Sequence, residues 1–408
     1  MTPPDPANRD AAGSTAKRRR SLPGTASAGR ARGGVNEDGT GEDGSLPRAA
    51  SPGSGRREFG AGGAVEARAS GLRPVGEWPE SVDRVYRDFF EGGAGAERTL
   101  RGNEEAFGRR WIVPRVLRGV GERDLSTALF GTELSMPVLV APTAFHLLAH
   151  PEGEAGTAAA AARAGTVMVL SMAATQAVEQ VAAGGAALWF QLYPQPDEEF
   201  QKALLGRVEK AGCRAIVVTA DSPVFGRRER DLRNGFTALP PGLACENMRD
   251  ASGRVRDIVM DAALGWQHVD RLRDATALPL VLKGVLHPDD ACIAIEHGVD
   301  GLIVSNHGGR QLDGAIATLD ALPAVVEAAG GRVPVLLDGG VRTGTDVLVA
   351  LALGAAAVLV GRPVLRGLAA GGAAGVLDVL EALRGQLDHA LALAGAKRPG
   401  DLTPDMIR

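Results

Sequence analysis

The chain of 408 residues has little of what marks several large classes of protein. It holds three cysteines, Cys213, Cys245 and Cys292, which lie too far apart for a CxxC motif or a metal-ligand set. We therefore expect buried, reduced thiols, as in a cytoplasmic protein, and no metal site. No run of about 18 apolar residues occurs, which predicts that the chain has no transmembrane helix.

An excess of positive charge is also absent. The formal net charge is −4, whereas nucleic-acid-binding proteins usually carry a strong basic excess, so we expect no nucleic-acid partner. The basic cluster Lys17–Arg20 is not followed by an apolar segment, which argues against a signal peptide and favours a cytoplasmic location.

The first part of the chain is poor in large apolar residues. Residues 1–70 contain 13 glycines and many Pro, Ser and Arg residues. Such a segment buries too little apolar surface to offset its ordering entropy. We expect a disordered tail over residues 1–75 and one folded domain over residues 76–408. A wrongly assigned start codon is an alternative origin for the tail.

The folded part shows short apolar runs that alternate with Ala-rich helical stretches. Runs rich in Val, Ile and Leu are typical of parallel strands covered on both faces. Eight such alternations predict an α/β fold of the (β/α)8 TIM-barrel type. The expected strands are Val138–Ala141, Val167–Leu170, Leu188–Leu192, Ile216–Thr219, Leu280–Leu282, Leu302–Val304, Val335–Leu337 and Val358–Val360.

Two segments fall outside this alternation. Trp78–Gly131 precedes the first strand, and we expect it to pack as helices against the barrel. About sixty residues separate Thr219 from Leu280, and an excursion of that length predicts a loop over the mouth of the barrel.

Polar or glycine-bearing segments follow nearly every predicted strand. Active sites of such barrels are built at the carboxyl ends of the strands, so we expect these residues to form one site. They are Pro142, Thr143, Ser171, Gln191, Tyr193, Thr219, Asp221, Lys283, Ser305–Arg310, Asp338–Gly340, Gly361 and Arg362.

The last two strand ends carry both glycine and arginine. Glycine lets the backbone approach a phosphate group, and arginine offers it a bidentate charge. We therefore favour a phosphate site at Gly339, Gly340, Arg342, Gly361 and Arg362 over the alternative that the glycines only form tight turns.

We expect Lys283 and His307 to take part directly in the reaction at this site. A lysine at the end of a buried strand needs a negative group nearby, and a histidine exchanges protons near neutral pH. Asp221 and Arg310 belong to the same predicted rim as His307, whereas we interpret the other six histidines as structural.

Several motifs together resemble the FMN-dependent 2-hydroxy-acid oxidase and dehydrogenase family. The resemblance covers Val85 to Leu393, and its most specific segment is Ser305–Asp313 (SNHGGRQLD). The other matching motifs are Ala141–Ala144, His150–Glu154, Phe190–Tyr193, Gly226–Arg228, Leu282–Gly284 and Asp338–Arg342.

The resemblance implies a role for each matching residue. His307 would take a proton from the substrate, and Asp221 would stabilise the imidazolium. Arg228 and Arg310 would hold the substrate carboxylate. The remaining roles are a hydrogen bond from Tyr193 near the reacting oxygen and a charge from Lys283 beside the flavin.

The resemblance also implies FMN as the cofactor and a set of residues that bind it. The implied set is Pro142, Thr143, Ala144, Ser171, Gln191, Thr219, Lys283, Ser305, Asp338, Gly339, Gly340, Arg342, Gly361 and Arg362.

The sequence departs from the glycolate oxidase pattern at two substrate positions. Phe89 stands where that pattern has tyrosine, and Ala173 stands where it has tryptophan. The first change removes a hydroxyl donor worth about 1–3 kcal/mol, and the second opens space. Together with the similarity of Phe89–Gly95 to 4-hydroxymandelate oxidases, they predict a bulky or aromatic 2-hydroxy acid as substrate.

Two other functions remain open. Another phosphate-binding barrel, such as an FMN-dependent isomerase or a lyase, would share the glycine and arginine loops. A flavin-binding protein with altered catalysis would tolerate Phe89 and Ala173. For the favoured function we expect O2 or another electron acceptor, no membrane attachment, and a homo-oligomer of the tetrameric kind common in this family.

Overall fold

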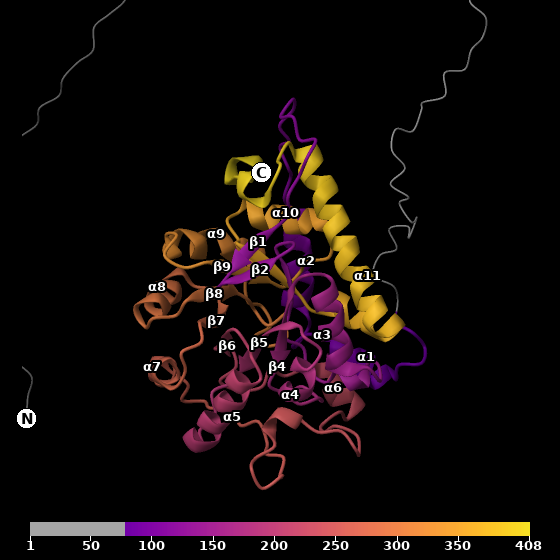
Figure 1. Cartoon of the computed structure of the whole chain (residues 1–408), viewed down its shortest axis with the longest axis vertical. Helices are drawn as coiled ribbons and strands as arrows, with labels where there is room; N and C mark the ends of the chain where they lie inside the picture. The colour runs from indigo at the N-terminus through magenta and orange to yellow at the C-terminus, as the bar shows by residue number, and fades with distance from the viewer. Residues whose placement is uncertain (1–77) are drawn as a thin grey trace, which may run out of the picture. The chain divides into compact units, whose positions relative to one another are not determined.

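The computed structural model describes residues 78–408, and Figure 1 shows their arrangement. The expected disordered tail, residues 1–75, lies outside the described residues, as does the basic cluster Lys17–Arg20.

Eight parallel strands form a closed barrel, which confirms the predicted fold. The barrel closes because β10 pairs with β3, with Val358 opposite Val138. The strands follow one another around the ring in chain order. They are β3 (Val138–Val140), β4 (Val167–Ser171), β5 (Ala187–Leu192), β6 (Ile216–Thr219), β7 (Leu280–Val285), β8 (Gly301–Val304), β9 (Val335–Asp338) and β10 (Ala357–Val360).

The strands are apolar on both faces because each face is buried. Alternate residues such as Leu139, Val169 and Ile303 fill the interior of the barrel, together with Trp189. The residues between them face the surrounding helices and belong to a second, larger core. This double burial explains the continuous apolar runs in the sequence.

Helices surround the barrel in the expected alternation (Figure 1). They are α3 (Gly153–Arg163), α4 (Val178–Ala182), α5 (Glu198–Lys210), α6 (Glu229–Asn234), α7 (Trp266–Ala275), α8 (Pro288–Glu296), α9 (Thr318–Ala329), α10 (Gly344–Ala352) and α11 (Arg362–Ala394). Short 3-10 turns occur at His146–Leu148, Glu246–Met248, Pro399–Asp401 and Pro404–Met406.

The segment before the barrel is only partly helical, so the prediction of helices throughout Trp78–Gly131 was wrong in one part. Helices α1 (Arg84–Glu91) and α2 (Arg98–Gly108) are present, and the side chain of Asp83 caps α1. Strands β1 (Thr127–Leu129) and β2 (Thr132–Leu134) form an antiparallel hairpin instead. Leu129 and Leu134 join the interior core, so the hairpin covers one opening of the barrel.

The long excursion after β6 is confirmed. Residues 220–265 contain only the short helix α6 and one 3-10 turn. Helix α1 packs against α6, and this contact brings Phe89 toward the mouth of the barrel.

Helix α11 is the one described helix that is long and apolar enough to cross a membrane, with a mean hydropathy of 1.3 over its most apolar window. It is kinked at Gly371 and Gly372, where the backbone leaves helical geometry. Half of that window is buried, and α11 packs along α3 and α10 (Figure 1). These contacts are those of a helix in the outer layer of the barrel core.

Candidate functional site

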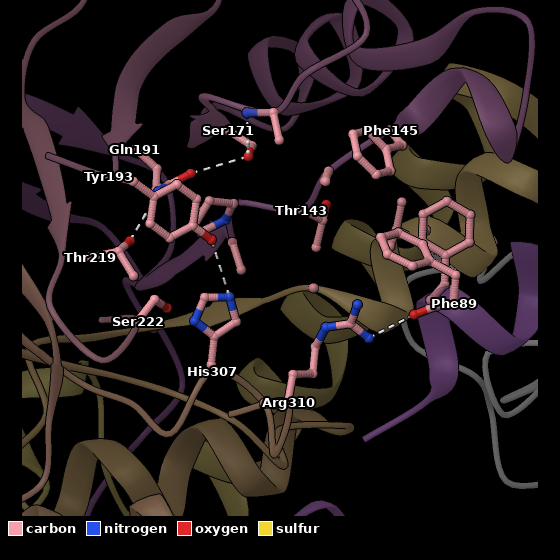
Figure 2. A pocket seen from close by; sticks show the side chains of 18 of the residues that line it. Phe89, Thr143, Phe145, Ser171, Gln191, Tyr193, Thr219, Ser222, His307 and Arg310 are labelled. Carbon is pink, nitrogen blue, oxygen red and sulfur yellow. Dashed lines mark hydrogen bonds between the residues drawn. The ribbon is translucent and has the colours of Figure 1, made fainter. Parts of the chain in front are cut away.

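A cavity of about 620 Å³ lies at the carboxyl ends of the barrel strands. Figure 2 shows side chains from several strand ends pointing into it. The structure therefore brings most of the predicted strand-end residues together around one cavity. The predicted residues that line the cavity are Phe89, Pro142, Thr143, Ala144, Ser171, Ala173, Gln191, Tyr193, Thr219, Arg228, Lys283, His307, Arg310, Asp338, Gly339, Gly340, Arg342, Gly361 and Arg362.

Two predicted residues lie behind this wall. Asp221 and Ser305 do not line the cavity, but each holds a residue that does. Asp221 bonds to His307, and Ser305 bonds to Lys283. They are therefore placed to orient the lining groups rather than to touch a ligand.

His307 is held between a carboxylate and a phenol. Its Nδ1 lies 2.9 Å from Oδ1 of Asp221, and its Nε2 lies 3.5 Å from the Tyr193 hydroxyl (Figure 2). The carboxylate fixes Nδ1 as the protonated nitrogen, so Nε2 is the nitrogen free to take a proton. Burial by itself raises the pKa of Asp221, but His307 and Lys283 lower it overall, which keeps the carboxylate charged.

Tyr193 stays protonated beside this pair. Burial and the charge of Asp221 both raise the pKa of the Tyr193 phenol. Its hydroxyl is therefore a neutral hydrogen-bonding group at the cavity wall.

The loop that carries His307 is held in an unusual conformation. His307, Gly308 and Gly309 have φ values of 60°, 63° and 75°, all in the left-handed region, which is uncommon for a histidine. Such strain persists only where surrounding contacts enforce it. Here Asn103 of α2 and Asn306 exchange two side-chain hydrogen bonds of 2.8 and 2.7 Å.

Asn103 is a supporting residue that sequence reasoning missed. It is buried, and its Oδ1 also accepts the backbone N–H of Thr318. A lone asparagine in a predicted helix gives no pattern from which this contact could be inferred.

Gln311 ties the same loop to the excursion after β6. Its Nε2 donates to the backbone oxygen of Asp221 at 3.1 Å, and its Oε1 accepts the backbone N–H of Gly226 at 2.7 Å. A Cβ at Gly226 would lie 2.1 Å from the Arg310 oxygen, so glycine is needed for this close approach.

Lys283 has the negative partner that the sequence predicted. Its Nζ lies 3.3 Å from Oδ2 of Asp338 and donates to Oγ of Ser305 at 2.9 Å. Ser305 in turn donates to Oδ1 of Asp338 at 2.6 Å. The lysine side chain is buried, with one N–H beyond these two contacts.

A chain of amide and hydroxyl groups forms another part of the wall. Oε1 of Gln191 accepts from the Ser171 hydroxyl at 3.1 Å, and its Nε2 donates to Oγ1 of Thr219 at 3.0 Å (Figure 2). All three residues are buried, so the amide of Gln191 has a fixed orientation at the cavity.

Two guanidinium groups lie close to the ring of Phe89. Those of Arg228 and Arg310 lie 5.4 and 5.0 Å from its centroid. Arg310 donates to the backbone oxygens of Phe89 and Gly92, at 2.6 and 2.8 Å. Burial and the neighbouring Arg228 and Arg362 lower the pKa of Arg310 well below its ordinary value, so an anion here would be stabilised.

Arg228 is oriented by a residue that the sequence analysis did not identify. Its Nε lies 2.9 Å from Oδ2 of Asp231 in α6, and Asp231 is buried. Burial raises the pKa of the Asp231 carboxyl, although Arg228 and Arg310 oppose this. The three-residue spacing between Arg228 and Asp231 was a usable helical signal.

The predicted phosphate end contains a half-buried cation, Arg362. Arg362 donates to the backbone oxygens of Phe90, Gly92 and Gly308, and none of the described carboxylates forms an ion pair with it. Burial and the neighbouring Arg342 lower its pKa to about 10. This arrangement fits a bound anion such as a phosphate group.

The glycines at this end also allow the backbone to turn tightly and to pack closely against α2. Gly339 and Gly340 have φ values of 91° and 89°, and a Cβ at Gly340 would lie 2.3 Å from the backbone oxygen of Asn103. The turn interpretation and the phosphate interpretation therefore both apply to these residues.

The outer part of the cavity is largely apolar. Phe145 stacks on Phe89 with a centroid separation of 5.3 Å, and residues of the excursion after β6 complete the wall. They are Leu239, Leu243, Val255 and Ile258. The irregular excursion carries no periodic pattern, so sequence reasoning did not identify these residues.

All three cysteines are free thiols, but the expectation that they are buried holds only for Cys213, since Cys245 and Cys292 are half-buried. Cys213 is buried in the core, whereas Cys245 is half-buried and lines the cavity. Burial raises the pKa of the Cys245 thiol to about 11, so it is neutral at pH 7.

Comparison with known protein families identifies one match over the described part of the chain. The model of a family described as FMN-dependent dehydrogenase matches residues 80–408. An L-lactate oxidase from Nostoc sp. is 47% identical over 79% of this chain and 93% of its own length. The human 2-hydroxyacid oxidase 1 is 46% identical over 79% of this chain and 91% of its own length.

Solved structures agree with this match. A mandelate oxidase crystallised with (S)-2-phenylpropionate is 42% identical, covers 80% of this chain and 94% of its own, and has a TM-score of 0.75. The similarity therefore covers both the fold of the barrel and the sequence as a whole.

Replacing Asn103 with leucine tests whether the asparagine pair supports the His307 loop. Asn306 would be left with unpaired buried groups, and we expect the free energy of unfolding to fall by about 1–3 kcal/mol. Urea unfolding followed by circular dichroism measures it. The matched control is Asn234→Leu, which removes a hydrogen bond to Asp88 at a less buried position. Equal losses in the two variants would contradict a special role for Asn103.

Proposed function

Because the chain belongs to the FMN-dependent dehydrogenase family, we propose that it oxidises a 2-hydroxy acid to the corresponding 2-oxo acid. Bound FMN would supply the two-electron acceptor for this reaction. The observation that carries the proposal is the position of one imidazole, Nε2 of His307, in the same cavity as the guanidinium groups of Arg228 and Arg310. Family membership also disfavours the isomerase and lyase alternatives.

The cavity wall fits FMN at both ends. Arg362 is a half-buried cation that forms no ion pair with a described carboxylate, and Arg342 and the loops at Gly340 and Gly361 lie in the same wall, so this end would hold the phosphate. At the other end, Lys283 offers a buried positive charge where the reduced flavin gathers negative charge. The Ser171, Gln191 and Thr219 chain would bond to the edge of the ring.

The substrate carboxylate would bind to Arg228 and Arg310. Planar guanidinium groups bind carboxylates through paired hydrogen bonds. The lowered pKa of Arg310 supports this, because a bound anion relieves the repulsion among the arginines. Asp231 forms an ion pair with Arg228 on its Nε side, and the two terminal nitrogens would bind the substrate.

His307 would act as the base. Its Nε2 takes the proton from the substrate, and Asp221 stabilises the imidazolium across a 2.9 Å contact. The Tyr193 hydroxyl, 3.5 Å from the same nitrogen, would orient the reacting oxygen. Asp221 would thus act through His307, whereas Tyr193 would touch the substrate.

We further propose a bulky or aromatic substrate with O2 as the final electron acceptor. Ala173 lines the cavity with a single methyl group, and Phe89 and Phe145 form an aromatic wall. Phe89 offers no hydroxyl to a small, highly polar acid. The relatives that support O2 are named oxidases, and the solved structure with an aryl ligand is a mandelate oxidase.

We also propose that the protein is a homo-oligomer and that the oligomer is a tetramer. One segment before the barrel exposes three large apolar side chains, Trp111, Val116 and Leu117, to 75%, 79% and 101%. Exposed apolar side chains that lie together are typical of a protein–protein interface. Sedimentation equilibrium of the holoprotein should give a mass near four times 42.1 kDa. A monomer at micromolar concentration would contradict the proposal.

His307→Gln tests the base directly. The amide keeps the size of the side chain but takes no proton, so anaerobic bleaching of the flavin by substrate should slow by at least about 100-fold. Stopped-flow absorbance measures this rate, and the spectrum before mixing shows that FMN is still bound. His287→Gln, at an exposed histidine, is the control. Bleaching at the parent rate in His307→Gln would remove His307 from the mechanism.

Ala173→Trp tests the size of the substrate site. The parent protein should oxidise mandelate-type acids with a higher kcat/KM than glycolate or lactate. The indole would fill the space above Ala173, so kcat/KM for aryl substrates should fall by roughly 10-fold or more. Peroxide release in air is the assay, and it also checks O2 as acceptor. Faster turnover of glycolate than of mandelates by the parent would contradict the bulky-substrate proposal.

A further inference from the structure

Thr143 has a hidden partner behind the cavity wall. It lies in the loop after β3, and its side chain points into the cavity in Figure 2. Its Oγ1 is 2.6 Å from Nε2 of His146, a histidine that is completely buried and does not line the cavity. His146 therefore reaches the site only through Thr143.

The imidazole of His146 is fixed at its other nitrogen as well. Nδ1 lies 3.0 Å from Oγ1 of Thr157, a buried residue of α3. The backbone N–H of His146 donates to Oε1 of Glu154 at 3.0 Å, and the same carboxylate accepts from Thr175. The ring is held at both ends and has no room to rotate.

The distances indicate which atom donates in each contact. Hydroxyl donors give short contacts, near 2.7 Å, whereas N–H donors give contacts near 2.9–3.0 Å. The 2.6 Å contact therefore favours the Thr143 hydroxyl as the donor and Nε2 as the acceptor. The 3.0 Å contact is one in which Nδ1–H donates to Thr157.

Thr157 is free to accept that proton because its own is used elsewhere. Its hydroxyl donates to the backbone oxygen of Gly153, one turn earlier in α3, at 3.4 Å. Burial lowers the pKa of His146, even though Glu154 opposes this, so the ring is neutral and carries one proton. The ring carries one proton for two contacts, so its tautomer sets which hydroxyl donates, and the two distances favour the tautomer with the proton on Nδ1.

We propose that His146 is a positioning residue that makes the Thr143 hydroxyl a hydrogen-bond acceptor toward the flavin site. Because the only proton of the Thr143 hydroxyl is donated to His146, the lone pairs of the hydroxyl oxygen face the cavity. Thr143 then pairs with N–H or O–H groups of the cofactor and not with its acceptor atoms. A lone pair also disfavours added negative charge, so His146 keeps the reduction potential of the flavin low. The inference rests on FMN binding in this cavity.

Thr157→Val is the test, because Thr157 does not touch the cavity. Valine has the same shape but accepts no hydrogen bond, so the proton of His146 moves to Nε2 and is donated to Thr143. The hydroxyl proton of Thr143 then turns toward the flavin. We expect the midpoint potential of bound FMN to rise and its dissociation constant to change by about five-fold, as for one hydrogen bond.

Two companion variants make the result specific. Thr157→Ser keeps the accepting hydroxyl and should retain the parent potential and spectrum. Thr143→Val removes the hydroxyl whose direction Thr157→Val would change. The double variant Thr143→Val/Thr157→Val should therefore have the same flavin potential as Thr143→Val alone. His146→Leu removes the acceptor by another route and should move the potential in the same direction as Thr157→Val.

The outcomes separate this inference from the proposed function. If the parent binds FMN and Thr157→Val has the parent potential, spectrum and dissociation constant, the role of His146 is overturned. The same holds if Thr157→Ser shifts the potential as far as Thr157→Val. If the parent protein itself binds no FMN, the proposed function fails instead. Should Thr157→Val be too unstable to isolate, an unshifted potential in His146→Leu overturns the inference.

Discussion

Closure of the barrel between β10 and β3 is the constraint on which the site depends. A closed ring of parallel strands brings every carboxyl end to one rim, so residues that are far apart in the sequence become neighbours. Lys283 meets Asp338 and Ser305 because β7, β8 and β9 are adjacent in this ring. The same adjacency lets Gln191 of β5 bridge Ser171 of β4 and Thr219 of β6.

The electrostatics of the cavity follow from the charged side chains at its rim. Arg228, Arg310 and Arg362 face a partly apolar space, although the chain as a whole has a net charge of −4. Their only direct carboxylate partner among the described residues is Asp231, which pairs with Arg228. Backbone oxygens solvate the other two guanidinium groups. The site thus stores repulsion that an anionic ligand relieves, which is a source of affinity.

Much of the fold and of the inner site was predictable from the sequence. The apolar runs located all eight strands because strands buried on both faces have a distinctive composition, and the polar residues after them located the rim. The hairpin at Thr127–Leu134 was missed because two strands of three residues are too short to show an alternation. Asn103, Phe145 and Leu239 were missed because tertiary contacts, which no local pattern encodes, place them at the site.

Most of the backbone oxygens that hold Arg310 and Arg362, those of Phe89, Phe90 and Gly92, lie at or just after the end of α1, which is outside the barrel. Two of the ligand-facing cations therefore have fixed positions only when this amino-terminal helix is docked. Docking of α1 and anion binding are consequently coupled equilibria, and each strengthens the other by the same free energy. A barrel without its docked amino-terminal helix would hold His307 in place and still have an incomplete anion site.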